Sequence, residues 1–171
     1  MLYVITGNGK GKSTSAMGQI LRSCGHGHKV CLVQLFKGKE FYGEQKILEK
    51  LPNVDIFAFA PKHPACFPNE SKEKLLKQCS EAIIFLKTLI NKRNNYKLIV
   101  LDEFIIGLRD KFIKADVLLE IILKLSSKSD VFITGRGAPV KLIKAADMVS
   151  NVQEVKHHFN NGTKAKKGIE F

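Results

Sequence analysis

Apolar runs of strand length alternate with stretches of helical periodicity along the whole chain. Short continuous apolar runs predict buried strands, whereas apolar residues repeating every three or four positions predict amphipathic helices. The expected strands span residues 2–6, 30–36, 54–60, 97–101, 131–134 and 148–155. The expected helices span residues 12–24, 70–92, 115–125 and 139–146.

This alternation predicts an α/β fold, with a mostly parallel sheet and helices on both faces. The 171 residues are about the length of one domain, and no repeat, low-complexity segment or linker divides them. We therefore expect a single domain over residues 1–171. A polar, glycine-containing loop is expected at residues 37–43. Residues 61–70 contain three prolines and are expected to be irregular.

A glycine-rich loop joins the first strand to the first helix and consists of Thr6, Gly7, Asn8, Gly9, Lys10, Gly11, Lys12, Ser13 and Thr14. Its second half fits the phosphate-loop pattern G-x-x-x-x-G-K-[ST], whereas Thr6 stands where the first glycine is usual. The alternating glycines let the backbone approach an anion, and the helix N-terminus adds a positive dipole end. We expect Lys12 and Lys10 to bind phosphates and Ser13 or Thr14 to ligate Mg²⁺. The loop predicts ATP binding in a RecA-like P-loop nucleotide-binding fold; the alternative is a turn that caps a helix without a ligand.

Two acidic residues, Asp102 and Glu103, follow a buried strand of the predicted sheet. Ligands of open α/β sheets bind at the carboxyl ends of the strands, where a carboxylate can hold Mg²⁺. The alternative is an aspartate that caps the following segment. Arg136 follows another apolar strand, so we expect it at the same edge, in contact with phosphate. The alternative there is a surface turn with a solvated arginine.

Composition and charge narrow the function classes. Lys plus Arg number 28 against 16 acidic residues, and the net charge of +12 favours an anionic partner or a lysine-rich solvated surface. The lysines are spread along the chain, so we expect no specific nucleic-acid recognition. The four cysteines, Cys24, Cys31, Cys66 and Cys79, lack metal-site spacing and are expected to be reduced thiols. No apolar run approaches the roughly 20 residues that span a bilayer, and residues 1–5 read as a strand rather than a signal peptide. We expect a cytoplasmic protein without a membrane partner.

Several segments together resemble the P-loop ATP:corrinoid adenosyltransferases, which act on cob(I)alamin or cob(I)yrinic acid a,c-diamide. They occur in family order and cover nearly the whole chain. The joint presence of the Thr-Gly-Arg-Gly segment and the Gly-Ile-Glu tail makes the resemblance specific. The matching pieces are residues 7–14, 33–38, 100–103 and 134–139, the pair Ala146-Asp147, and, in the tail, Lys156-His157, Gly162, Lys164-Ala165 and Gly168-Ile169-Glu170.

The resemblance implies transfer of the 5′-deoxyadenosyl group of ATP to Co(I) of a reduced corrinoid, with release of triphosphate, in adenosylcobalamin formation or salvage. It also implies a flavoprotein reductant and a homodimer. Lys12, Lys10 and Arg136 would be catalytic, residues 6–14 would bind ATP, and Ser13, Asp102 and Glu103 would hold Mg²⁺. The alternatives are another P-loop phosphotransferase and a nucleic-acid-linked ATPase.

The corrinoid-facing segment departs from the family pattern. Relatives place a Phe-x-Trp-type aromatic pair after the third strand, whereas this chain contains no Trp. The corresponding residues 62–67 offer His63 and Phe67 instead. By family position, these two side chains are expected to lie against the corrinoid.

Overall fold

The computed structural model describes residues 1–38, 42–63, 67, 69–91 and 95–170. Within these residues, six strands form one sheet in the order β3-β2-β4-β5-β1-β6. Every strand pairing in the sheet is parallel, as the sequence predicts. The strands are β1 (Leu2–Thr6), β2 (Lys29–Leu35), β3 (Val54–Phe59), β4 (Tyr96–Asp102), β5 (Asp130–Thr134) and β6 (Met148–Asn151).

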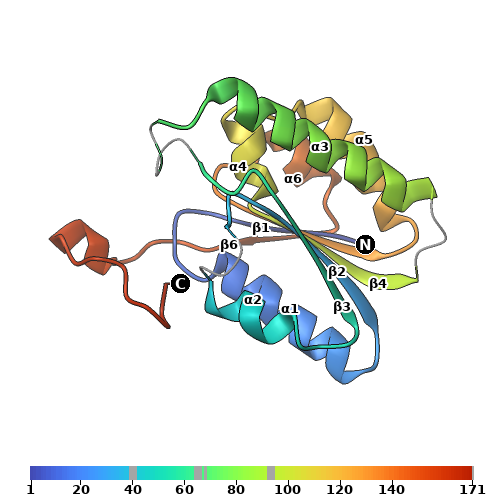
Figure 1. Ribbon diagram of the computed structural model, residues 1–171, viewed down its shortest axis with the longest axis horizontal. Helices are drawn as coiled ribbons and strands as arrows, with labels where there is room; N and C mark the ends of the chain where they lie inside the picture. The colour runs from blue at the N-terminus through green and yellow to red at the C-terminus, as the bar shows by residue number, and fades with distance from the viewer. Residues whose placement is uncertain (39–41, 64–66, 68, 92–94, 171) are drawn as a thin grey trace.

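Helices cover both faces of the sheet (Figure 1). One face carries α1 (Lys12–Gly25) and α2 (Gly43–Leu48), and the other carries α3 (Lys72–Asn91), α4 (Phe104–Arg109), α5 (Ala115–Ser126) and α6 (Val140–Ala145). The short helices α2 and α4 and a 3₁₀ turn at His158–Asn161 (η1) are additions to the predicted elements. The first two are six residues long. That is too short for a helical repeat to stand out in the sequence.

The strands are buried on both faces, which explains their nearly continuous apolar sequences. On β2, the side chains of Cys31, Val33 and Leu35 belong to the core under α3, α4 and α5. The alternating residues Val30 and Leu32 belong to a second core under α1. The two cores hold the sheet between two helical layers and fix where each strand ends.

The cysteines of the described residues fit the expectation of reduced thiols. Cys24, Cys31 and Cys79 are free, and Cys66 lies outside the described residues. Burial raises the pKa of the Cys31 thiol to about 12 and that of Cys79 to about 11. Both therefore remain protonated at neutral pH and act as small apolar side chains. In the described part of the chain, no helix has both the length and the apolar character needed to cross a membrane.

Candidate active site at the carboxyl edge of the sheet

Five neighbouring strands end in a residue with left-handed backbone. Gly7 follows β1 with φ 103° and Gly135 follows β5 with φ 140°, while Phe36, Ala60 and Glu103 follow β2, β3 and β4 with φ 58°, 48° and 64°. Each non-glycine residue in this conformation costs about 1–2 kcal/mol. Such strain gathers at functional sites, and ligands of open α/β sheets bind at this edge. The carboxyl edge is therefore the candidate site.

Gly7 and Gly9 make room for another part of the chain. A Cβ on Gly7 would lie 2.3 Å from the Val152 carbonyl oxygen, and one on Gly9 would lie 2.5 Å from that of Gln153. The Gly9 amide donates to Val152 O at 2.8 Å, and the Val152 amide donates to Thr6 O at 2.8 Å. β6 ends at Asn151 rather than residue 155, because the chain beyond it packs on the phosphate loop instead of extending the sheet.

Of the three loop glycines, Gly11 is the one that faces open space. No atom lies within 4 Å of where its Cβ would stand, and its φ of 116° favours glycine. The expectation that the alternating glycines let the loop approach an anion stays a prediction. Gly7 and Gly9 serve chain packing, and Gly11 forms the open turn into α1.

The cations of the loop differ in exposure. Lys12 is 6% exposed, and its ammonium donates to the Gly9 carbonyl at 2.5 Å. Burial, followed by the positive charge of Arg136, lowers the pKa of Lys12, with Glu103 and Glu154 opposing that shift. Lys10 is exposed, and its ammonium donates to the Ile169 carbonyl at 2.6 Å. Lys12, Arg136 and Glu103 therefore share one electrostatic neighbourhood, with Lys10 on the adjoining loop.

Thr6 ties the phosphate loop to the segment that carries Arg136. Its hydroxyl oxygen accepts a hydrogen bond from the Ala138 amide at 3.2 Å. Next to it, the Gly135 amide donates to the Ile5 carbonyl at 3.2 Å. A glycine at position 6 would lose the hydroxyl bond, which gives Thr6 a physical role in place of the usual first glycine.

Asp102 is fully buried, and protein groups occupy both its carboxylate oxygens. The Lys37 ammonium lies 2.9 Å from Oδ2, which also accepts from Gln34 Nε2 at 3.1 Å, while the Thr134 hydroxyl donates to Oδ1 at 2.7 Å. Burial alone would raise the pKa of Asp102, but the Lys37 charge and the hydrogen bonds from Lys37, Thr134 and Gln34 together outweigh it and lower that pKa. Burial alone would lower the pKa of Lys37, but Asp102, joined by Glu44 and Glu103, outweighs it and raises that pKa.

Lys37 and Gln34 were assigned no role from the sequence, although both lie in the matched segment 33–38. Lys37 also lies 3.4 Å from the Glu44 carboxylate, and the Gln34 side chain accepts from Gln45 Nε2 at 2.7 Å. A buried polar network therefore joins the ends of β2 and β4 to the start of α2. In this network Lys37 is the cation that neutralises Asp102.

Glu103 differs from Asp102 in that one of its carboxylate oxygens makes no hydrogen bond to the described residues. Its amide donates to the Thr134 hydroxyl at 3.0 Å, and its side-chain Oε2 is buried with no hydrogen-bond partner among the described residues. Burial, and then the charge of Asp102, raises the pKa of Glu103. Ser13 lies half-buried in the first turn of α1. No group of three or more His, Cys, Asp or Glu side chains within the described residues could hold a metal.

His63 and Phe67 occupy different environments in the segment after β3. The His63 side chain is 15% exposed, and its Nε2 lies 2.9 Å from the Asp110 carboxylate. The Phe67 amide donates to the His63 carbonyl at 2.9 Å, while Phe67 itself is 47% exposed. Pro64, Ala65, Cys66 and Pro68 lie outside the described residues.

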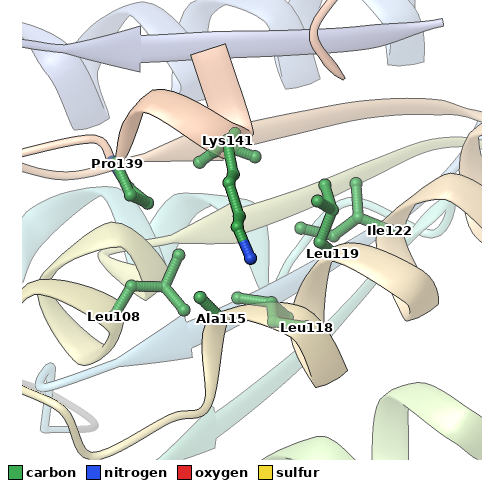
Figure 2. Close-up of a pocket in the computed structure, with 8 residues that line it drawn as sticks. Leu108, Ala115, Leu118, Leu119, Ile122, Pro139 and Lys141 are labelled. Carbon is green, nitrogen blue, oxygen red and sulfur yellow. The ribbon is translucent and has the colours of Figure 1, made fainter. Parts of the chain in front are cut away.

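A small apolar pocket lies between α4, α5 and α6 (Figure 2). Leucine and isoleucine side chains of α4 and α5 line it with Pro139 and Lys141, and it includes none of the residues predicted to bind nucleotide, metal or corrinoid. The Lys141 ammonium, the blue atom in Figure 2, bonds the Asp116 carboxylate at 2.9 Å. We assign the pocket to helix packing rather than to the site.

The fold is similar to that of a known protein of low sequence identity. The flagellar accessory protein FlaH from Methanocaldococcus jannaschii superposes with a TM-score of 0.58 at 16% identity, over 88% of this chain and 70% of that one. Together with the strand order and the loop after β1, this likeness confirms the expected RecA-like α/β fold.

The sequence comparisons identify the family. The model of the family "ATP:corrinoid adenosyltransferase BtuR/CobO/CobP" matches residues 1–171. Corrinoid adenosyltransferases of Pseudomonas aeruginosa and Escherichia coli strain K12 are 35% and 31% identical, each over the whole of this chain and over 83% and 85% of their own lengths. A Sinorhizobium corrinoid adenosyltransferase is 32% identical over 80% of its length. The chain belongs to the ATP:corrinoid adenosyltransferase family.

Proposed function

We propose that the chain transfers the 5′-deoxyadenosyl group of ATP to the cobalt of a reduced corrinoid and releases triphosphate. The family match over residues 1–171 carries this assignment. The reacting nucleophile, Co(I), arrives with the substrate, so the protein needs no nucleophilic side chain of its own. Its tasks are to align cobalt with C5′ of ATP and to stabilise charge on the departing triphosphate.

We infer that Lys12, Lys10 and Arg136 stabilise that charge. Lys12 and Arg136 lie near enough for the arginine to lower the lysine pKa, so an anion between them would be attracted to both. Lys10 donates to a neutral carbonyl, and charged phosphate oxygens form stronger bonds with an ammonium. Beyond Gly11, the free amides of the first turn of α1 and its dipole support the same role. Residues 6–14 would together bind the phosphates.

Magnesium fits the donor groups of this edge. The Oε2 of Glu103, which has no hydrogen-bond partner in the described part of the chain, and the half-buried hydroxyl of Ser13 are oxygen ligands of the kind that Mg²⁺ prefers. We propose these two as its protein ligands, and Mg²⁺ bound there would neutralise triphosphate charge. The sequence predicts Asp102 as a third ligand. Both oxygens of Asp102 already bond to Lys37, Gln34 or Thr134, so we propose that Asp102 supports the site through these residues and does not ligate the metal.

The corrinoid face is proposed to include Phe67 and His63. Phe67 is exposed and follows the end of β3 at the carboxyl edge, where an apolar ring could cover one side of the macrocycle. Keeping water and other axial ligands away would ease reduction of Co(II). The proposal that a flavoprotein supplies the electron rests on the family resemblance alone.

A homodimer is also proposed, with residues 1–171 acting as one domain. β6 forms an edge of the sheet, and its Met148 and Val149 are 45% and 39% exposed. The adjoining α6 exposes Val140 and Ile143 at 66% and 40%. Exposed apolar residues beside an unpaired edge strand favour association.

The test is anaerobic incubation with ATP, Mg²⁺ and chemically reduced cobalamin. We expect the absorption spectrum of the adenosylated product together with inorganic triphosphate in equal amount. Lys12→Met should be inactive, while Lys128→Met, which changes an exposed lysine outside the carboxyl edge, should match the unaltered protein. Release of ADP, with or without stimulation by DNA or RNA, would instead support a phosphotransferase or a nucleic-acid-linked ATPase.

A further inference from the structure

A half-buried carboxylate joins two loops of the candidate site. Asp110, just after α4, accepts from His63 Nε2 at 2.9 Å on Oδ2. Arg109 donates to both oxygens of the same carboxylate, from Nε at 2.6 Å and from Nη2 at 2.8 Å. These bonds, first that of Arg109, lower the pKa of Asp110 and keep it ionised. Because an ionised carboxylate only accepts, the shared proton resides on His63 Nε2.

Two aromatic rings also contact the histidine ring. The Phe36 ring meets the His63 ring edge-on, with centroids 4.8 Å apart and planes at 84°. The Phe112 ring does the same at 6.0 Å and 79°. Phe36 follows β2 and Phe112 follows α4, so the His63 ring lies between the carboxyl edge of the sheet and the turn after α4. These contacts hold the His63 side chain in place. Phe67, the other proposed corrinoid contact of this segment, is exposed.

Arg109 extends the connection to the nucleotide side. A Cβ on Gly137 would lie 3.0 Å from Arg109 Cδ, so the arginine stem packs on the backbone beside Arg136. One carboxylate thus links His63, after β3, to Arg109, which packs on the loop that carries a proposed triphosphate ligand. The two loops would face the two substrates that must meet.

We propose that Asp110 is a positioning residue for the corrinoid, acting through His63. The inference rests on the proposed function and gives Asp110, His63 and Phe67 separate roles in it. Asp110 accepts the Nε2 proton of His63 in a hydrogen bond and so fixes the orientation in which the imidazole ring meets the corrinoid. Phe67, hydrogen-bonded through its amide to the His63 carbonyl, is held in turn and covers the macrocycle. Sequence reasoning assigned no role to Asp110, Arg109 or Phe112.

The experiment is a double-mutant cycle of Asp110→Ala and His63→Ala, with KM measured for reduced corrinoid and for ATP. We expect each single variant to raise the corrinoid KM by about tenfold, which is the loss of one charge-assisted hydrogen bond. The corrinoid KM of the double variant should be no higher than that of the single variant with the higher KM, because both substitutions remove the same contact. The KM for ATP should stay within twofold. Asp116→Ala, which breaks an exposed pair with Lys141, is the matched control and should change neither KM.

Two results would overturn the inference: a corrinoid KM within twofold of the unaltered protein in Asp110→Ala, or effects that multiply to about 100-fold in the double variant. If Asp110→Ala fails to fold, Asp110→Leu has a similar shape, cannot accept the His63 hydrogen bond and gives the same test. A structural role alone would lower the melting temperature and affect both KM values together. If the unaltered protein forms no adenosylated corrinoid, the proposed function itself fails, which is a separate outcome.

Discussion

Replacing Lys37 by Met should destabilise the protein strongly, although Lys37 contacts no substrate in our proposal. The side chain is 7% exposed, and its ammonium lies 2.9 Å from the wholly buried Asp102 carboxylate. Methionine fills a similar volume without the charge, so the change leaves Asp102 charged, buried and without its counter-ion. Breaking one side of such a pair costs about 3–5 kcal/mol. For a domain of this size, that corresponds to a melting temperature lower by roughly 6–20 °C.

The stability lost in the Lys37→Met variant should be larger at high pH than at low pH. In the unaltered protein, the pKa of Asp102 is lowered, so its stabilisation is present above the unfolded pKa of about 4 and is lost as pH falls through the folded value. The pKa of Lys37 is raised, so its stabilisation is present below about 10.5 and is lost as pH rises through the folded value. Without Lys37, burial favours the protonated Asp102. The variant should therefore recover as the pH is lowered from 8 toward 5.

Melting curves followed by circular dichroism at pH 8 and pH 5 measure this directly. Lys141→Met is the control, because Lys141 also lies 2.9 Å from a carboxylate but with 70% and 80% of the two side chains exposed. It should leave the melting temperature unchanged, since water screens that pair. The double variant Lys37→Met with Asp102→Asn should recover part of the loss. A Lys37→Met protein that melts within 2 °C of the unaltered one, or whose deficit ignores pH, would refute the reasoning.

Further predictions concern the loop and the metal. Lys12→Ala should lower kcat by roughly 10²-fold or more, because it removes a cation at the leaving triphosphate; activity within threefold of the unaltered protein would contradict the loop's role. Gly9→Ala should weaken ATP binding about tenfold in calorimetric titration, because the new Cβ would meet the Gln153 carbonyl at 2.5 Å. Gly18→Ala, with no atom within 4 Å, should bind ATP normally. Glu103→Gln should raise the Mg²⁺ needed for half-maximal activity without lowering the melting temperature, because the raised pKa of Glu103 makes its charge unfavourable in the folded protein near pH 7. An unchanged Mg²⁺ titration would remove Glu103 from the metal.

Most of the sheet was predictable because its strands are buried on both sides. Such strands appear as unbroken apolar runs, and 30–36 and 97–101 lie within one or two residues of β2 and β4. The helix α4 was not predictable in the same way. It spans only Phe104–Arg109, and three of its six residues are buried apolar or glycine positions without a polar face to set a period.

The candidate site was predictable in its parts but not in its contacts. Lys12, Glu103 and Arg136 each follow a strand, so their common edge could be inferred from chain order. The partners of Asp102 could not, because Lys37 lies 65 positions away and the sequence does not show which cation a buried acid will meet. The closeness of Gly9 to Val152 was equally hidden, since it depends on how the chain leaves β6.

The contact between Gly9 and Val152 would make the affinity for ATP depend on residues near the C-terminal end of the chain. Hydrogen bonds to Val152 hold the phosphate loop as part of the fold, so its conformational entropy is lost on folding rather than on binding. Fixing a residue's backbone costs about 1–2 kcal/mol, and a loop left loose would subtract that cost from its affinity for ATP. By reciprocity, bound ATP should hold residues 151–153 in place as firmly as they hold the loop. Slower hydrogen exchange at the Val152 amide in the presence of ATP would be the sign of a site assembled from both ends of the sequence.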